Sequence, residues 1–352
     1  MGAEPAPNGA GRGRRRCSRA GVRAARAPTH CPDGPAGERG AGLAAVVTAV
    51  LGFSWGFILV KVIPLAPAPL AAWRLGLGAV GLGAVALAWR LPWPRLRGAM
   101  LLAGAAFGAH QLLFVTATRL TSVAVVTLLM SLQPLVVALL SRRTVGERVP
   151  PALVGWSLVG IAGVALTLLA TSGDAVRSPV GDLLAVANLA AFTAYFLAAK
   201  RTRASGVPTL TFTATFLGVA LVVVAPMAAL EGPSAVAVDA SAVALLALMA
   251  FGPGSGHLLL NWAHPRVSAA LASLALATVP ALASLWAHLV LGEPLGVWHG
   301  VGLALVVMAL AGGQRVERAA TGDARPGWRP TAPWASRAHR RLPRGRGGQR
   351  SR

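Results

Sequence analysis

Long apolar runs fill the chain between about residues 41 and 313, and polar residues collect in the short segments between these runs. A membrane-spanning helix needs roughly 20 predominantly apolar residues. Reading the sequence with that window predicts ten spans, and the connections between them are too short to hold a soluble domain. The spans are expected near 41–63, 67–89, 98–117, 121–141, 151–171, 180–199, 209–229, 240–261, 267–291 and 297–313; the eighth, with its FGPGSGH run, is the least regular.

Composition agrees with a membrane as the solvent. Of the 352 residues, 55% are hydrophobic and only 12% are charged, whereas a soluble domain has about 25% charged residues. The first apolar run is too long and starts too far into the chain for a signal-peptide core, and no small-residue cleavage site follows it. The expected fold class is therefore an all-α polytopic membrane protein.

The net charge of +22 is concentrated at the two ends of the chain, with eight of the 33 Lys and Arg before residue 40 and eleven after residue 313. Segments 1–40 and 314–352 are rich in Gly, Pro and Arg and poor in large apolar residues, so they are predicted to be disordered tails. Contact with anionic lipid is expected of them, and nucleic-acid binding is not. Cys17 and Cys31 lie in the first tail without zinc-like spacing, so no disulfide framework, metal site or cofactor is expected.

Charges in the connections predict the orientation. One alternating set of connections holds ten Lys and Arg and the other holds two, Arg119 and Arg177. Positively charged loops stay in the cytoplasm, and both basic tails fall on the rich side. We expect a multi-pass protein of the cell (inner) membrane with cytoplasmic N and C termini, which requires an even number of spans.

An internal repeat divides the spans into two halves. SLQPLVVALLSRRTVGE at 131–147 matches ATVPALASLWAHLVLGE at 277–293, with Pro134 and Gly146-Glu147 each 146 positions before Pro280 and Gly292-Glu293. Further upstream an offset of 139 aligns Lys61 with Lys200 and Pro69 with Pro208. These matches predict two five-helix repeats, at 41–171 and 180–313.

Five is an odd number, so the second repeat is expected to cross the membrane in the opposite sense to the first. Inversion also explains why the two arginines of SRRTVGE have no counterpart in the second copy, which would face outward. Inverted repeats are a recurrent architecture of secondary transporters, with the substrate site at the repeat interface.

The repeated residues have two readings each. Pro134 and Pro280 remove a backbone N–H within a span, which predicts a kink that serves either close packing or a hinge. Glu147 and Glu293 each stand just before the next span and are expected to cap that helix end, with coupling or substrate contact as the alternative.

Four segments resemble the EamA-type transporters of the drug/metabolite transporter superfamily: AVLGFSWGFILVKVI at 49–63, PLAAWRLGLGAVGL at 69–82, and the longer stretches 121–166 and 267–312. The resemblance covers about residues 41–313. It implies ten helices in two inverted repeats and export of small metabolites, amino acids or drugs without nucleotide hydrolysis. The second copy departs from the pattern at Ala191–Tyr195, where the first has Ser54-Trp55-Gly56.

Polar residues inside spans are candidate substrate contacts, because a charged side chain there costs about 2.5 to 3.5 kcal/mol at the helix centre. Arg74 is expected to pair with Asp182 or to guide anionic groups. His257 and Asn261 share a helix face and are expected either to face His110 and Gln111 across a central pocket or to form ordinary interhelical hydrogen bonds. The substrate-binding candidates are Trp55, Arg74, His110, Gln111, Asn188, Tyr195, His257 and Asn261.

These patterns favour a secondary transporter with a small-molecule substrate in a lipid bilayer, working by alternating access. No Asp or Glu lies mid-span, so His110 or His257 is the candidate group for proton coupling; a homodimer is one candidate assembly. No Walker A, H-E-x-x-H or paired CxxC motif is present, and GPGSGH at 252–257 lacks the G-x-S-x-G spacing, so an enzyme is not expected. The alternative is a non-transporting membrane scaffold or sensor whose basic tails bind partners.

Overall fold

The computed structural model describes residues 35–121, 123–169, 178–232, 237–292 and 296–322. Within these stretches every regular element is an α-helix, and ten helical segments are long and apolar enough to cross a membrane. The predicted ten-span, all-α architecture is thus confirmed. The first and last helices extend beyond the expected spans: α1 (Pro35–Val62) begins before residue 41, and α14 (Val297–Gly322) continues past residue 313.

Most spans are single helices and the rest are broken into two. The single helices are α1, α2 (Pro67–Ala88), α3 (Gly98–Leu120), α6 (Pro151–Leu169), α7 (Pro179–Arg203), α8 (Thr209–Leu230) and α14. The broken spans are α4 (Val123–Ser131) with α5 (Gln133–Thr144), α10 (Ala240–Phe251) with α11 (Ser255–Ala263), and α12 (Ala269–Leu276) with α13 (Val279–Leu291).

The two repeated prolines coincide with two of these breaks. Pro134 is the second residue of α5 and Pro280 is the second residue of α13, and both are buried. Proline fits the first turn of a helix, where its missing N–H would have no partner, but not the interior of one. The chain therefore ends one helix before each proline and starts another at it, so the predicted kinks are present as interruptions.

Glycine and proline break the eighth span, which the sequence marks as irregular. A Cβ added to Gly254 would lie 2.0 Å from the carbonyl oxygen of Ala250, so only glycine fits there. Pro253, in the same break, packs on α1: added Cβ atoms at Gly52 and Gly56 would lie 3.7 and 3.5 Å from its Cα and Cβ. Small residues spaced by four let two membrane helices approach closely, so α1 supplies the cover for the broken segment.

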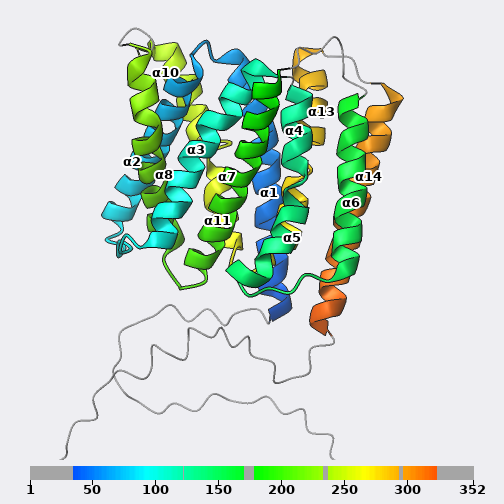
Figure 1. The fold of residues 1–352 in the computed structure, drawn as a ribbon. Helices are drawn as coiled ribbons and strands as arrows, with labels where there is room; N and C mark the ends of the chain where they lie inside the picture. Colours follow the sequence, from blue (N-terminus) through cyan, green and yellow to red (C-terminus); the bar gives the residue numbers. More distant parts are fainter. Residues whose placement is uncertain (1–34, 122, 170–177, 233–236, 293–295, 323–352) are drawn as a thin grey trace, which may run out of the picture.

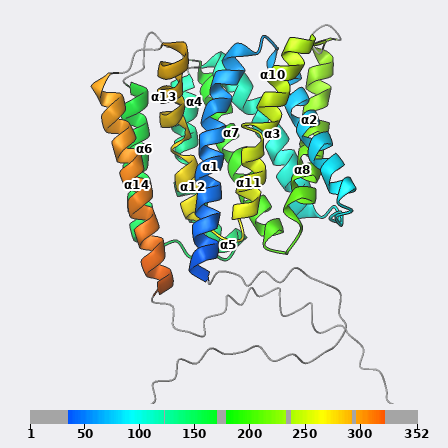
Figure 2. The same cartoon turned by 180° about the vertical axis from the view of Figure 1, so that it is seen from behind.

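The most extensive packing joins helices of different sequence halves. α3 packs along α7 and α8, α2 packs along α8, and α6 packs along α14. Figures 1 and 2 show α2, α8 and α10 at one side of the bundle and α6 and α14 at the other, with α1, α7 and α11 between them. The two repeats predicted from the sequence are therefore interleaved rather than packed as separate five-helix bundles.

The helix ends identify two opposite faces of the bundle. α1 begins and α14 ends at the lower end in Figure 1, where α5 also lies, whereas α13 lies at the upper end. The ends of the described chain are thus on one side, and the two helices that carry Pro134 and Pro280 are on different sides.

Close glycine contacts hold α6 and α14 together, and this gives a test of the packing. A Cβ added to Gly302 would lie 2.3 Å from Oγ1 of Thr167 and 2.5 Å from the carbonyl oxygen of Gly163. We expect Gly302→Ala to destabilise the protein by about 1 to 3 kcal/mol, the usual cost of overpacking, measured as a lower Tm in detergent. Gly300→Ala is the matched control, because nothing lies within 4 Å of its added Cβ. Equal Tm values for the two variants would contradict the close α6–α14 contact.

Candidate functional site

Three polar side chains from three spans meet inside the bundle. Nη2 of Arg74, on α2, lies 3.4 Å from Nε2 of His257, on α11. Nδ1 of the same imidazole lies 3.3 Å from the hydroxyl of Tyr195, on α7. A guanidinium only donates hydrogen bonds, so Nε2 of His257 accepts and a neutral ring carries its proton on Nδ1, toward Tyr195. Tyr195 is fully buried and His257 is 6% exposed, so this group sits in the protein interior.

Aromatic rings surround the imidazole of His257. The ring of Phe107, on α3, lies 4.6 Å from it edge to face and 4.7 Å from the ring of Tyr195. Phe53, on α1, lies 4.6 Å from His257 on another side, and Phe216 of α8 lies 5.3 Å from Tyr195. Aromatic pairs at such separations are mutually stabilising. The polar group is therefore held among aromatic rings from four spans, α1, α3, α7 and α8.

A second polar group lies next to the first. Nδ1 of His110, on α3, lies 2.6 Å from Oδ1 of Asn188 on α7, and the Asn188 amide donates to the sulfur of Met130 at 3.1 Å. The ring of Phe192 lies 4.6 Å from that of His110. Phe107 also contacts His110, at 5.8 Å between ring centres. One phenylalanine thus links the two histidines that the sequence singles out.

The structure does not bring all eight predicted site residues together. Asn261 lies one turn beyond His257 and donates to Oγ1 of Thr213 at 3.1 Å. Gln111 is buried but follows His110 directly, so it projects from a different face of α3. Trp55 is 39% exposed and its ring lies 5.5 Å from that of Trp286, between α1 and α13. Arg74, His110, Asn188, Tyr195 and His257 are the candidates that the geometry unites.

The pairing of Arg74 with Asp182 that the sequence suggested is not formed. Oδ1 of Asp182 accepts a hydrogen bond from Oγ1 of Thr121 at 2.7 Å, while Arg74 reaches His257. Asp182 lies in the first turn of α7 and Tyr195 lies 13 residues further along the same helix, so different parts of α7 make the two contacts.

Sequence reasoning missed the aromatic residues, although the signal is present. Phe107 precedes His110 by three positions and Phe192 precedes Tyr195 by three, which puts each pair on one helix face. The sequence predictions include the polar residue of each pair, His110 and Tyr195, but not the phenylalanine one turn before it. A search for aromatic residues one turn from each intramembrane polar group would have found them.

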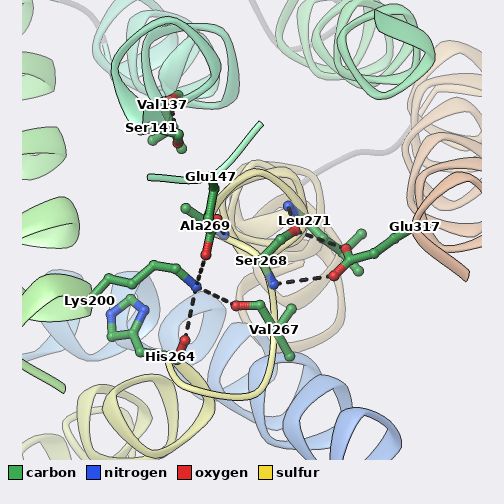
Figure 3. Close-up of polar contacts among 10 residues, drawn as sticks. All are labelled: Val137, Ser141, Glu147, Lys200, His264, Val267, Ser268, Ala269, Leu271 and Glu317. Carbon is green, nitrogen blue, oxygen red and sulfur yellow. Dashed lines mark hydrogen bonds and ion pairs between the residues drawn. The ribbon is translucent and has the colours of Figure 1, made fainter. Parts of the chain in front are cut away.

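A separate polar network lies at the end of the bundle where α1 begins (Figure 3). The Glu147 carboxylate pairs with the Lys200 ammonium at 2.8 Å through Oε1 and accepts from the backbone N–H of Ala269 at 2.7 Å through Oε2. The Glu317 carboxylate accepts from the N–H and hydroxyl of Ser268 at 3.2 and 2.9 Å. Glu147 therefore contacts the start of α12, not the adjacent α6 that it was expected to cap. Glu293, its counterpart in the repeat, lies outside the described residues.

His264 adds no charge to this network. Burial, together with the positive charges of Lys200 and Arg203, holds the pKa of its imidazole well below the usual range. The ring is therefore neutral near pH 7 and does not repel the Lys200 ammonium. The ammonium donates a hydrogen bond to the backbone carbonyl of His264 at 2.9 Å.

Ten apolar helices around an interior polar group define a multi-pass membrane protein, and comparisons with known proteins refine that class. Residues 179–312 match the model of the EamA-like transporter family, within the drug/metabolite transporter superfamily. This is a family of membrane transporters and not of enzymes. The resemblance seen in the sequence is confirmed over the second predicted repeat, whose boundaries the match follows closely.

The solved structures support the same fold. One chain, titled only "Crystal structure of protein", matches with a TM-score of 0.69 and 24% sequence identity over 79% of this chain and 99% of its own length. No curated protein matches the chain significantly. Among the described residues no group of three or more His, Cys, Asp or Glu is placed to hold a metal ion.

Proposed function

We propose that the protein is a secondary transporter that exports a small metabolite, amino acid or drug by alternating access. The observation that carries the proposal is the Arg74–His257–Tyr195 group, which combines α2 of the first half with α7 and α11 of the second. Polar and charged groups in the membrane interior are costly and mark substrate or ion pathways. Such a site would lie where the two proposed repeats meet, as expected of a carrier built from inverted repeats.

Arg74 is the residue through which this site would select its substrate. Its guanidinium has five N–H donors, and its hydrogen-bond contact with the described residues is the single one to His257, a neutral acceptor at 3.4 Å. A cation in a low-dielectric interior needs a compensating charge, and no described carboxylate pairs with this one. We therefore propose an organic anion, such as a carboxylate, as the substrate, with the aromatic rings around His257 packing on its apolar part.

Alternating access also requires the orientation proposed from the sequence. The repeats 41–171 and 180–313 would cross the membrane in opposite senses, with both termini in the cytoplasm. The location of α5 and α13 at opposite ends of the bundle supports this arrangement. Since the strongest contacts join helices of different halves, the units that rock would be mixed groups of helices from both repeats.

Flux in reconstituted vesicles tests the transport proposal. We expect the parent protein to move carboxylates but not the matching neutral amides, and Arg74→Gln to lower carboxylate flux by about 10-fold or more, because a hydrogen bond to a charged group contributes about 1.5 to 3 kcal/mol. Arg143→Gln, at an exposed position of α5, should leave flux unchanged. A parent protein that moves no member of a broad panel would favour the scaffold alternative, and undiminished flux in Arg74→Gln would exclude the role of Arg74.

Proton coupling is proposed to depend on the two interior histidines. If a pH gradient drives flux, the pH dependence of flux should disappear in the double variant His110→Ala, His257→Ala, because these two imidazoles are the groups proposed to bind and release the coupled proton. His288→Ala, on the exposed face of α13, serves as the control and should keep the parent profile. An unchanged pH profile in the double variant would exclude this assignment.

The orientation can be measured with single cysteines. In a background with Cys17 and Cys31 replaced by serine, Arg143→Cys places a thiol at an exposed position in the last turn of α5, and Gly296→Cys places one just before α14. We expect a membrane-impermeant maleimide to reach the first only from the cytoplasm and the second only from outside. Labelling of both from the same compartment would rule out inverted repeats.

A further inference from the structure

Lys200 connects three segments of the chain at one end of the bundle. It stands near the end of α7 with its side chain only 7% exposed. Its ammonium donates to Oε1 of Glu147 at 2.8 Å, to the carbonyl of His264 at 2.9 Å and to the carbonyl of Val267 at 2.5 Å. An ammonium has three N–H donors, so all of them are used. Figure 3 shows the side chain lying between Glu147 and the turn that joins α11 to α12.

The start of α12 has more caps than helix formation needs. The hydroxyl of Ser268 accepts from the N–H of Leu271 at 3.1 Å, which is an ordinary N-cap. Glu317 of α14 then holds Ser268, and Glu147 binds the N–H of Ala269. Carboxylates are favourable at helix N-termini, but Glu147 arrives from the connection between α5 and α6, in the other half of the sequence. It therefore ties two parts of the bundle together in addition to capping a helix.

The helix held in this way is α12, which is not continuous with α13 and can move relative to it. All eight residues of α12 are buried, and the helix packs on α5, α14 and α1. The span is interrupted between Leu276 and Val279, so α12 is joined to α13 by a short non-helical link and can tilt separately from it. Helix ends joined by such links are common hinge positions.

The charges of Glu147 and Lys200 can be stabilised in two ways, by the ion pair when this end of the bundle is closed and by water when it is open. A buried ammonium and a carboxylate are stabilised when they are paired, and leaving one of them buried alone is strongly unfavourable. If the end of the bundle opened, water would reach both groups, and hydration would replace the ion pair. The Glu147 side chain is already 29% exposed, so the pair lies at the boundary that water would cross first.

We propose that the Glu147–Lys200 ion pair is a latch that closes this end of the carrier and opens during each transport cycle. The inference rests on the proposed transport function for its purpose but not for its geometry. With the predicted orientation, this end faces the cytoplasm. Glu317 caps the same helix from within the second half and is not part of the latch.

Thiol labelling of a buried serine at this end tests the latch directly. Ser141 on α5 is fully buried, and it lies near the network in Figure 3. In a background with Cys17 and Cys31 replaced by serine, Ser141→Cys should react slowly with a membrane-impermeant maleimide. Glu147→Gln keeps an acceptor for the Ala269 N–H but breaks the ion pair, and we expect it to raise the labelling rate by about 5-fold or more, the lower end of usual conformational couplings.

Glu317→Gln in the same background is the matched control, because it alters a carboxylate at the same helix end and keeps both partners of the Glu147–Lys200 ion pair. Its labelling rate should stay within about 2-fold of that of the Ser141→Cys protein, on the same coupling scale. Equal rates for the Glu147→Gln and Glu317→Gln proteins, whether raised or unchanged, would overturn the latch. Lys200→Gln provides a second variant and should match Glu147→Gln.

Vesicle flux separates this inference from the function on which it rests. A parent protein that transports while Glu147→Gln leaves labelling unchanged would retain the carrier and exclude the latch. If Glu147→Gln is labelled faster but the parent protein transports no substrate of the panel, the ion pair would still control opening, and the transport function would be excluded.

Discussion

The hydrocarbon core of a membrane offers no water to a broken backbone, so an interrupted helix is tolerated only where protein or a cavity covers it. Three of the ten spans are interrupted, and the residues at each break are covered. The break before Ser255 packs on Gly52 and Gly56 of α1, α12 is buried along its whole length, and Ser131 and Gln133, which flank the break between α4 and α5, are buried. The same interrupted spans carry side chains of the candidate site, since His257 lies in the first turn of α11 and Met130, which contacts Asn188, lies near the end of α4. The helices that cover these breaks also enclose the polar interior.

The two buried cations Lys200 and Arg74 differ in the charge of their partners. This difference is the basis for proposing that Lys200 closes the carrier and that Arg74 binds the substrate. Lys200 uses all three of its donors within the protein, including one to a carboxylate. Arg74 meets only a neutral imidazole among the described residues. A satisfied charge contributes to one arrangement of the helices, whereas an unsatisfied one gains free energy from an arriving anion. In the proposed carrier, Lys200 stabilises one arrangement of the helices and Arg74 binds the substrate.

Local signals in the sequence predicted the spans and their interruptions, because hydropathy and proline act over a few residues. They did not predict the partner of Glu147, which lies 122 residues away in the chain at Ala269. The alternation of charges assigns Lys200 to a loop, but long-range packing buries it near the end of α7. The interior cluster was predicted in part: His110, Asn188, Tyr195 and His257 were recognised as polar residues in spans, while Phe107, which contacts three of them, was not. Repetition in the sequence still pairs Glu147 with Glu293 and Lys200 with Lys61, a relation that only an alignment of the two halves reveals.

The interleaved packing has a consequence for how the chain is made. α2 and α3 are synthesised long before α7 and α8, the helices along which they pack. Until those later helices are inserted, the glycine-lined face of α3 and the side chain of His110 have only lipid or early neighbours for contact. Contacts between residues far apart in sequence also slow folding. Assembly of the bundle therefore waits for the last helices to leave the ribosome, and the first five spans made alone would lack the surfaces on which they are built to pack.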